Sequence, residues 1–154
     1  TSNFLFAQTH TYEYESAGIT FEHNSLSINE KSSRETPLSI VFQAGVNPFS
    51  VNILFKEVKK EGTLESFIKQ EIEQHKQGGY TKEISIVKIN LNGFDAYEII
   101  RDSKIVKVRW YIFESKRNKK LYSFWLAENK MLKKENTLAL EGYEEMKTTL
   151  KLSE

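Results

Sequence analysis

The 154 residues include 39% hydrophobic and 12% aromatic side chains, enough for one packed domain with its own core. Lysine and arginine (22) almost equal aspartate and glutamate (21), which argues against binding nucleic acid or anionic membranes through bulk charge. The chain has no cysteine, which excludes disulfides, thiolate metal sites and cysteine nucleophiles, and no apolar run near the roughly 20 residues that span a bilayer.

The N-terminus has two interpretations. The run Asn3–Gln8 resembles the tail of a signal peptide, with Ala7 at the position that a signal peptidase prefers. The alternative is an N-terminal strand. We therefore predict an N-terminal extension over residues 1–16, a signal-peptide remnant on the first interpretation, and a single domain over residues 17–154.

The first third of the chain predicts short strands separated by polar breaks. Ile19–Phe21 and Leu26–Ile28 flank the break at residues 22–25. A β-branched and aromatic strand follows at Leu38–Gln43, and Phe49–Val58 alternates apolar with other residues.

Residues 63–78 predict the first helix. The Thr63 hydroxyl can accept a hydrogen bond from a free backbone amide, as a helix N-cap does. One apolar stripe then recurs at helical spacing, formed by Leu64, Phe67, Ile68 and Ile72. Gly78-Gly79 ends the helix, because glycine accepts the left-handed geometry that closes helices.

A four-stranded antiparallel meander is predicted next. Asn92-Gly93 is a strong signal for a two-residue hairpin turn, because both positions tolerate positive φ. Tight turns are also expected at residues 102–104 and at the charged tip Lys116–Lys120. Parallel neighbours would need longer crossovers, so these strands are antiparallel: Glu83–Leu91, Phe94–Arg101, Ile105–Ser115 and Leu121–Glu128.

A terminal helix is predicted from Asn136 or Thr137. Its inward stripe is Ala139, Tyr143, Met146 and Leu150, and its solvent face is Glu141, Glu144, Glu145 and Lys147. Strands, a helix, four strands and a second helix predict the α+β class, with an antiparallel sheet and a four-stranded meander flanked by helices.

This layout resembles the Mog/PsbP-like superfamily, which includes the DcrB-like bacterial proteins. Residues 87–98, in which a strand ends in Asn92-Gly93 and the next begins with Ala96-Tyr97, carry most of the resemblance. It covers about residues 17–152 and implies an α/β/α sandwich. Members mostly act by binding, as photosystem II stabilisers, small-GTPase binders, envelope lipoproteins or chaperones that load type VI secretion effectors. The usual Pro-x-x-Trp is missing, since residues 27–30 read Ser-Ile-Asn-Glu.

No catalytic or metal-binding motif occurs in the sequence. There is no Gly-x-Ser-x-Gly elbow, phosphate-binding glycine loop or His-Glu-x-x-His helix. His75 suits a partly buried position near a helix end. His10 and His23 have acidic neighbours but lack metal-ligand spacing. We expect no cofactor, no metal and no catalytic residue.

Basic runs occur at residues 56–60, 116–120 and 130–134. Lysines at strand ends and hairpin tips stay solvated and block edge pairing. The alternative is that two of these tips converge into a patch for an acidic partner or lipid head groups.

Six aromatic residues lie on two neighbouring predicted strands: Trp110, Tyr111, Phe113, Tyr122, Phe124 and Trp125. They are core if helices cover both faces of the sheet. If one face is partly open, Tyr111, Phe113 and Trp125 form a candidate binding surface.

We therefore expect a non-enzymatic binding or accessory protein of the bacterial envelope that binds another protein and not nucleic acid. It would be exported to the periplasm or cell surface, and we expect a lipid anchor upstream of Thr1 as its only attachment to the membrane. The first alternative is a cytoplasmic adaptor chaperone that holds an apolar helix of a client, as in type VI effector loading. The second is an enzyme with an unrecognised site.

Overall fold

The computed structural model describes residues 9–24, 29–32, 39–46, 48–58, 62–78 and 83–154. Its helices are α1 (Leu64–Gly78) and α2 (Lys133–Thr149), with a short 3-10 turn η1 (Glu15–Ala17). Its strands are β1 (Thr9–Tyr14), β2 (Ile19–Asn24), β3 (Asn29–Ser32), β4 (Ser39–Val46), β5 (Phe49–Val58), β6 (Glu83–Leu91), β7 (Phe94–Asp102), β8 (Val106–Glu114), β9 (Leu121–Asn129) and β10 (Lys151–Leu152).

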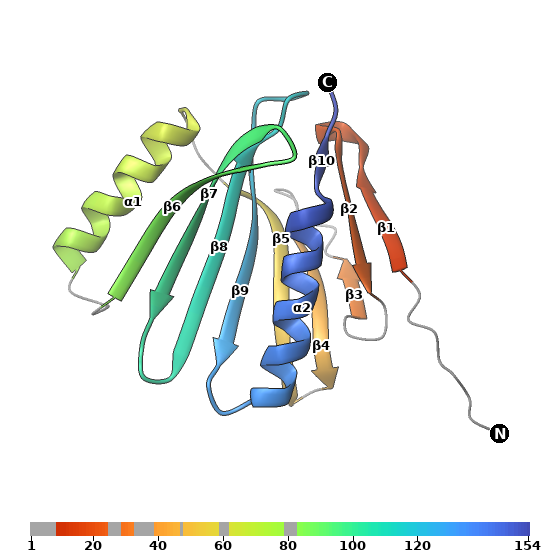
Figure 1. Ribbon diagram of the computed structural model, residues 1–154, viewed down its shortest axis with the longest axis vertical. Helices are drawn as coiled ribbons and strands as arrows, with labels where there is room; N and C mark the ends of the chain where they lie inside the picture. The colour runs from red at the N-terminus through yellow and green to blue at the C-terminus, as the bar shows by residue number, and fades with distance from the viewer. Residues whose placement is uncertain (1–8, 25–28, 33–38, 47, 59–61, 79–82) are drawn as a thin grey trace.

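The strands form two antiparallel sheets (Figure 1). The large sheet has seven strands in the order β3-β4-β5-β9-β8-β7-β6, and the small sheet has the order β1-β2-β10. β6 to β9 pair consecutively, and the predicted hairpin turn is confirmed, because Asn92 and Gly93 adopt φ angles of 57° and 85°. The predicted strand at residues 26–28 lies outside the described residues.

The predicted fold class, an α/β/α sandwich with a helix-flanked sheet, is wrong. The described residues hold ten strands in two sheets and only two helices longer than a single turn, so the protein is mostly antiparallel β. One face of the large sheet packs on the three-stranded sheet together with α2, and α1 packs on only part of the opposite face, so the sheet is not enclosed between two helical layers (Figure 1). The sequence pattern missed this second sheet, because β10 has only two residues and β1 was assigned to an extension.

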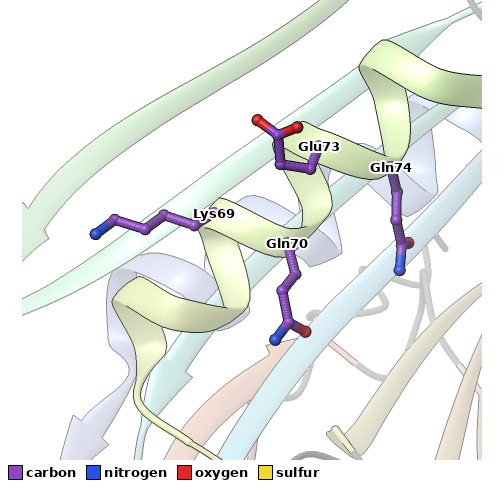
Figure 2. Close-up of a pocket in the computed structure, with 4 residues that line it drawn as sticks. All are labelled: Lys69, Gln70, Glu73 and Gln74. Carbon is purple, nitrogen blue, oxygen red and sulfur yellow. The ribbon is translucent and has the colours of Figure 1, made fainter.

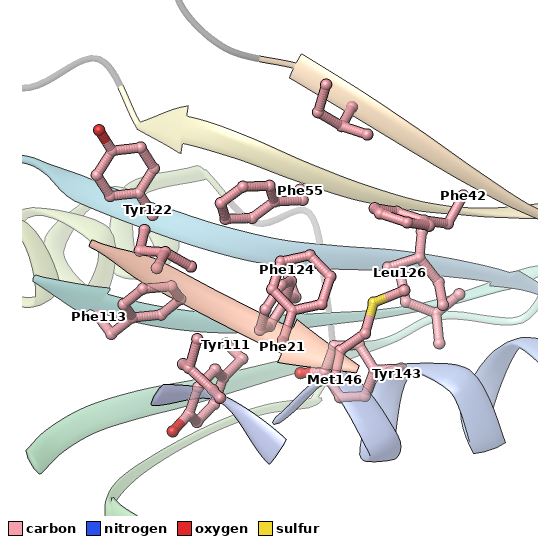
Figure 3. Packing of buried hydrophobic residues seen from close by; sticks show 14 of the residues in the cluster. Phe21, Phe42, Phe55, Tyr111, Phe113, Tyr122, Phe124, Leu126, Tyr143 and Met146 are labelled. Carbon is pink, nitrogen blue, oxygen red and sulfur yellow. The ribbon is translucent and has the colours of Figure 1, made fainter. Parts of the chain in front are cut away.

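The main core fills the space between the large sheet, α2 and the small sheet (Figure 3). Phe21 of the small sheet contacts two large-sheet rings edge-on, at 5.0 Å from Phe124 and 5.2 Å from Phe55 between ring centroids. The predicted inward stripe of α2 is confirmed, since its four residues are fully buried: Ala139, Tyr143, Met146 and Leu150. Edge-to-face pairs of this kind stabilise a core beyond the area that they bury.

A second, smaller core lies under α1 on the opposite face. Leu64 and Ile68 of α1 pack on buried side chains of the meander, namely Ile99, Ile112 and Leu121. The predicted cap is present, because the Ser66 amide donates a hydrogen bond to Thr63 Oγ1 at 3.2 Å. α1 covers only part of this face, and β6 at the far edge of the sheet carries partly exposed side chains.

The small sheet joins the two ends of the chain. β2 pairs with β1 on one side and with β10 on the other, so residues 9–14 belong to the folded domain and not to a separate extension. Gly18 makes this possible: its φ is 63°, and a Cβ there would lie 2.3 Å from the Ser153 carbonyl oxygen. Any side chain at Gly18 would therefore separate β10 from β2.

Candidate functional site

The three aromatic residues predicted as a binding surface do not share a face. Tyr111 and Phe113 are fully buried on the α2 side, stacked beside their cross-strand neighbours Phe124 and Tyr122. Trp125 lies on the opposite face, where it pairs with Trp110. Tyr111, Phe113 and Trp125 therefore cannot form one exposed surface.

The histidines form no metal site within the described part of the chain. His10 and His23 are opposite one another on β1 and β2, with ring centroids 5.5 Å apart. No group of three or more metal-ligating side chains comes together among the described residues. Burial, followed by the nearby His10, lowers the pKa of His23, so these surroundings favour the neutral ring over the charged one. The side chain of His75 lies outside the described residues.

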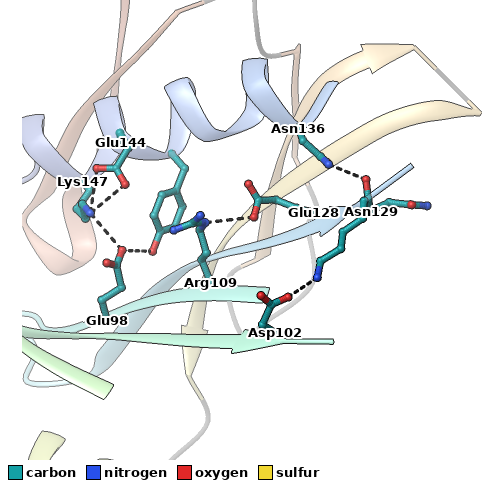
Figure 4. Close-up of polar contacts among 10 residues, drawn as sticks. Glu98, Asp102, Arg109, Glu128, Asn129, Asn136, Glu144 and Lys147 are labelled. Carbon is teal, nitrogen blue, oxygen red and sulfur yellow. Dashed lines mark hydrogen bonds and ion pairs between the residues drawn. The ribbon is translucent and has the colours of Figure 1, made fainter. Parts of the chain in front are cut away.

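A buried polar cluster lies between α2 and the meander (Figure 4). Glu98 Oε2 accepts hydrogen bonds from the Tyr143 hydroxyl at 2.9 Å and from Lys147 Nζ at 3.1 Å. Lys147 also pairs with Glu144 at 2.9 Å. Sequence periodicity placed Lys147 on the solvent face, but this prediction is wrong because the ammonium is buried against Glu98 of β7.

The pKa values of two tyrosines near this cluster are shifted away from those of a general base. Burial, followed by the Glu98 carboxylate, raises the pKa of Tyr143 far above the ordinary phenol value, and the same two causes raise the pKa of Tyr111. A phenol that acts as a general base needs a pKa lowered toward the working pH, which is the opposite shift. The Tyr111 hydroxyl has no hydrogen-bond partner within the described residues. The cluster instead ties α2 to β7.

One pocket of about 300 Å³ lies on α1 (Figure 2). Its described lining consists of Lys69, Gln70, Glu73 and Gln74, all from one helix. A ligand site usually combines apolar walls with polar groups that converge from several elements. This pocket has neither feature within its described lining, so we do not assign a ligand to it.

The basic runs do not converge. The Lys116–Lys120 run connects β8 to β9, and Lys130–Lys134 follows β9, so the two lie at opposite ends of the large sheet. Lys56 lies on β5 above the Trp125 ring, at 5.8 Å, while residues 59 and 60 lie outside the described residues. A joint patch of the Lys116 and Lys130 tips is therefore excluded.

The most distinctive surface is the outer edge of β6, the last strand of the large sheet within the described residues (Figure 1). Residues in an antiparallel pair alternate between exchanging hydrogen bonds and turning their backbone groups away. The two-residue turn makes Leu91 and Phe94 a hydrogen-bonded pair, so the odd-numbered residues of β6 bond to β7. The backbone groups that point to the open edge belong to Ile84, Ile86, Lys88 and Asn90.

The side chains of β6 do little to block this edge. Ile84 and Val87 are exposed, and Val87 reaches 51% exposure. Native edges are usually protected by charges, prolines or bulges. Lys88 is the only charged residue between Ile84 and Leu91, and its ammonium lies 3.3 Å from Asp95 on β7. The sequence predicted this strand, but nothing in the sequence alone showed that it would end the sheet.

Comparison with known proteins adds no identity. No protein-family model matches the chain, and no curated protein matches it. Neither described helix combines the length and apolar character needed to cross a membrane. The candidate site therefore rests on geometry alone.

Proposed function

We propose that this chain is a non-enzymatic binding protein that holds an extended segment of a partner protein along the open edge of β6. The outward backbone groups of β6 carry the proposal, because an added strand satisfies such groups with main-chain hydrogen bonds. Exposed Ile84 and Val87 supply apolar contact on both faces of the added strand.

Strand addition suits the structure better than capture of a client helix. A helix needs an open apolar sheet face, and the aromatic residues that suggested one, Tyr111 and Phe113, are buried. An extended segment needs only the edge, and the even-numbered residues of β6 offer it outward N–H and C=O groups along the strand.

We further propose that the protein works at the cell envelope as an accessory factor. The sequence feature that supports this is the run Asn3–Gln8, which resembles the tail of a signal peptide. Fractionation of cells that express the native gene tests it. Recovery of the protein only with the cytosol would overturn the envelope assignment and leave the β6 proposal intact.

The alternation along β6 gives a sharp test of strand addition. The Lys88 amide points to the open edge, so Lys88→Pro removes an outward donor without breaking a bond to β7. Lys88→Ala is the matched control, because it removes the same charge and keeps the amide. A photoreactive residue in place of Val87 should cross-link one defined protein in cells, and Lys88→Pro should abolish that adduct while Lys88→Ala retains it.

Circular dichroism melts of both Lys88 variants should show that the fold survives. Loss of the adduct in both variants would mean that charge, and not the strand edge, holds the partner. If sedimentation shows a dimer that Lys88→Pro disrupts, the segment bound at the edge of β6 belongs to a second copy of the chain and not to another protein. Either result contradicts the proposal.

A further inference from the structure

The four most exposed large hydrophobic side chains within the described residues all lie at one end of the large sheet. They are Met131 at 85% exposure, Val46 at 70%, Ile105 at 66% and Phe49 at 60%. They occupy three separate places, namely the paired ends of β4 and β5, the β7–β8 turn and the β9–α2 loop, which lie together at the lower end of Figure 1. We call these three places together the loop end.

The three parts of the loop end are tied to one another. The Lys130 amide donates a hydrogen bond to the Ile105 carbonyl oxygen at 2.9 Å, and the Lys130 ammonium pairs with Asp102. On the other side, the end of β4 touches the first turn of α2, since a Cβ placed on Gly45 would lie 2.8 Å from Glu135 Cγ. The three parts therefore form one continuous surface.

The β9–α2 loop is also held by hydrogen bonds within itself. Asn129 holds it: its side-chain oxygen accepts a hydrogen bond from the Met131 amide at 3.0 Å, and its carbonyl oxygen accepts one from Asn136 Nδ2 at 2.6 Å. Figure 4 shows the Asn129–Asn136 contact. Met131 is thus held outward by an ordered turn.

Exposed lysines flank two of these apolar tips, Ile105 and Met131. Lys104 precedes Ile105, and Lys133 and Lys134 follow Met131. Asp102 is paired with Lys130, and Glu135 is the acidic residue in the first turn of α2, so lysines still outnumber carboxylates in this group. Lysines in the first turn of α2 oppose the helix dipole, so helix stability does not explain their position. The local positive charge contrasts with a net charge of only +1 for the whole chain.

We propose that the loop end docks on an anionic lipid bilayer. Apolar side chains on the tips of separate loops do not line a groove, but they can enter the boundary between head groups and acyl chains together. The adjacent lysines would then contact anionic head groups, whose attraction adds to that of the apolar tips. The surface shares no residue with the edge of β6, so this inference stands independently of the proposed function.

The absence of cysteine allows one unique label to be placed at either end of the sheet. Met131→Cys and the control Lys116→Cys, which lies on the opposite β8–β9 tip, would each carry an environment-sensitive fluorophore. With vesicles of phosphatidylcholine and phosphatidylglycerol, the label at position 131 should brighten and shift to the blue, whereas the label at position 116 should not. Pure phosphatidylcholine should give a much smaller response.

Charge variants test the electrostatic part by vesicle sedimentation. Lys133→Ala with Lys134→Ala should lower the partition coefficient by roughly tenfold or more, since each lysine near an anionic surface contributes about a fivefold change. The matched control, Lys116→Ala with Lys151→Ala, removes the same charge at the other end and should change it little. Ile105→Glu with Met131→Glu should abolish binding while the melting curve stays unchanged.

Three results would overturn the proposal. One is no sedimentation with anionic vesicles at low salt. Another is an equal loss from both lysine pairs, which would show attraction without a defined surface. The third is unchanged binding by the Ile105 and Met131 variant, which would exclude insertion of the tips.

Discussion

Lys147 offers the most direct test of how the buried polar cluster stabilises the fold. Replacement by methionine keeps most of the length of the side chain and removes the ammonium that pairs with Glu98 at 3.1 Å. The two side chains are only 10% and 14% exposed, so the remaining carboxylate would be nearly buried, with the Tyr143 hydroxyl as its neutral donor. Removing one partner from a buried pair costs about 3–5 kcal/mol, and the residual exposure places Lys147→Met near 3 kcal/mol.

A second substitution should reverse most of that loss. Glu98→Gln removes the charge but keeps an oxygen that can accept from Tyr143, so Lys147→Met with Glu98→Gln should lie within about 1 kcal/mol of the unmodified chain. Urea unfolding at neutral pH, followed by tryptophan fluorescence, measures the unfolding free energy of Lys147→Met, of Glu98→Gln and of the double variant. Lys133→Met, at an exposed position of the same helix, should cost no more than about 0.5 kcal/mol. Additive losses in the double variant, or a loss below about 1 kcal/mol for Lys147→Met, would refute the reasoning.

Three further stability predictions follow from single polar side chains. Tyr111→Phe should be neutral or stabilising by about 1 kcal/mol in urea unfolding, because it removes a buried hydroxyl without a partner in the described residues; a clear loss would contradict this. Asn92→Gly should lower the unfolding free energy by about 1 kcal/mol, because the side-chain Nδ2 of Asn92 donates hydrogen bonds to the Thr148 and Leu150 carbonyl oxygens. Asn92→Ala should lower the unfolding free energy by about 1 kcal/mol more, because alanine would have to adopt the positive φ of this position. Equal melting temperatures for Asn92→Gly and Asn92→Ala would show that the positive φ of this position costs alanine nothing. Because the folded-state pKa of His23 lies below its ordinary value of 6.5, the unfolded chain binds the proton more readily, so the unfolding free energy should fall as pH drops below 6.5. This pH dependence should be weaker in His23→Leu, and an unchanged profile would contradict it.

Local rules predicted the individual elements well. Alternation and the Asn92-Gly93 turn gave the bounds of β6 without error, and Phe49–Val58 matches β5. Thr63 caps α1 as its hydroxyl chemistry predicts. The start of α2 was placed too late, because Lys133 follows Leu132, which provides no capping side chain. Each success depends on residues only a few positions apart.

The errors concern contacts between distant segments. β10 is two residues long and exists because Ser153 and Gly18 bring it to β2, more than a hundred residues away in sequence. Lys147 lies at a position that helical periodicity assigns to solvent, and only the distant Glu98 makes its burial stable. Neither contact has a signal at short range in the sequence.

The error in the aromatic set has a different origin, because the register was accessible. The β8–β9 hairpin pairs Glu114 with Leu121, which brings Tyr111 opposite Phe124 and Trp110 opposite Trp125. Counting back from that turn separates Trp125 from Tyr111, since directly opposed residues share a face. The register does not show which face of the sheet packs against α2 and the small sheet. That packing decides which aromatic side chains are buried.

The two proposed surfaces are related by the direction of the strands. β6 begins at Glu83, opposite Asp102, which leads into the Ile105 turn, so the open edge rises from the loop end toward the Asn92-Gly93 turn. If the loop end docks on a bilayer, the open edge of β6 points away from the lipid, and a partner segment can bind along it. Lys88→Pro should then abolish partner binding and leave vesicle binding unchanged, while the Ile105 and Met131 variant should do the reverse. Loss of both activities in either variant would show that the two surfaces are not separate.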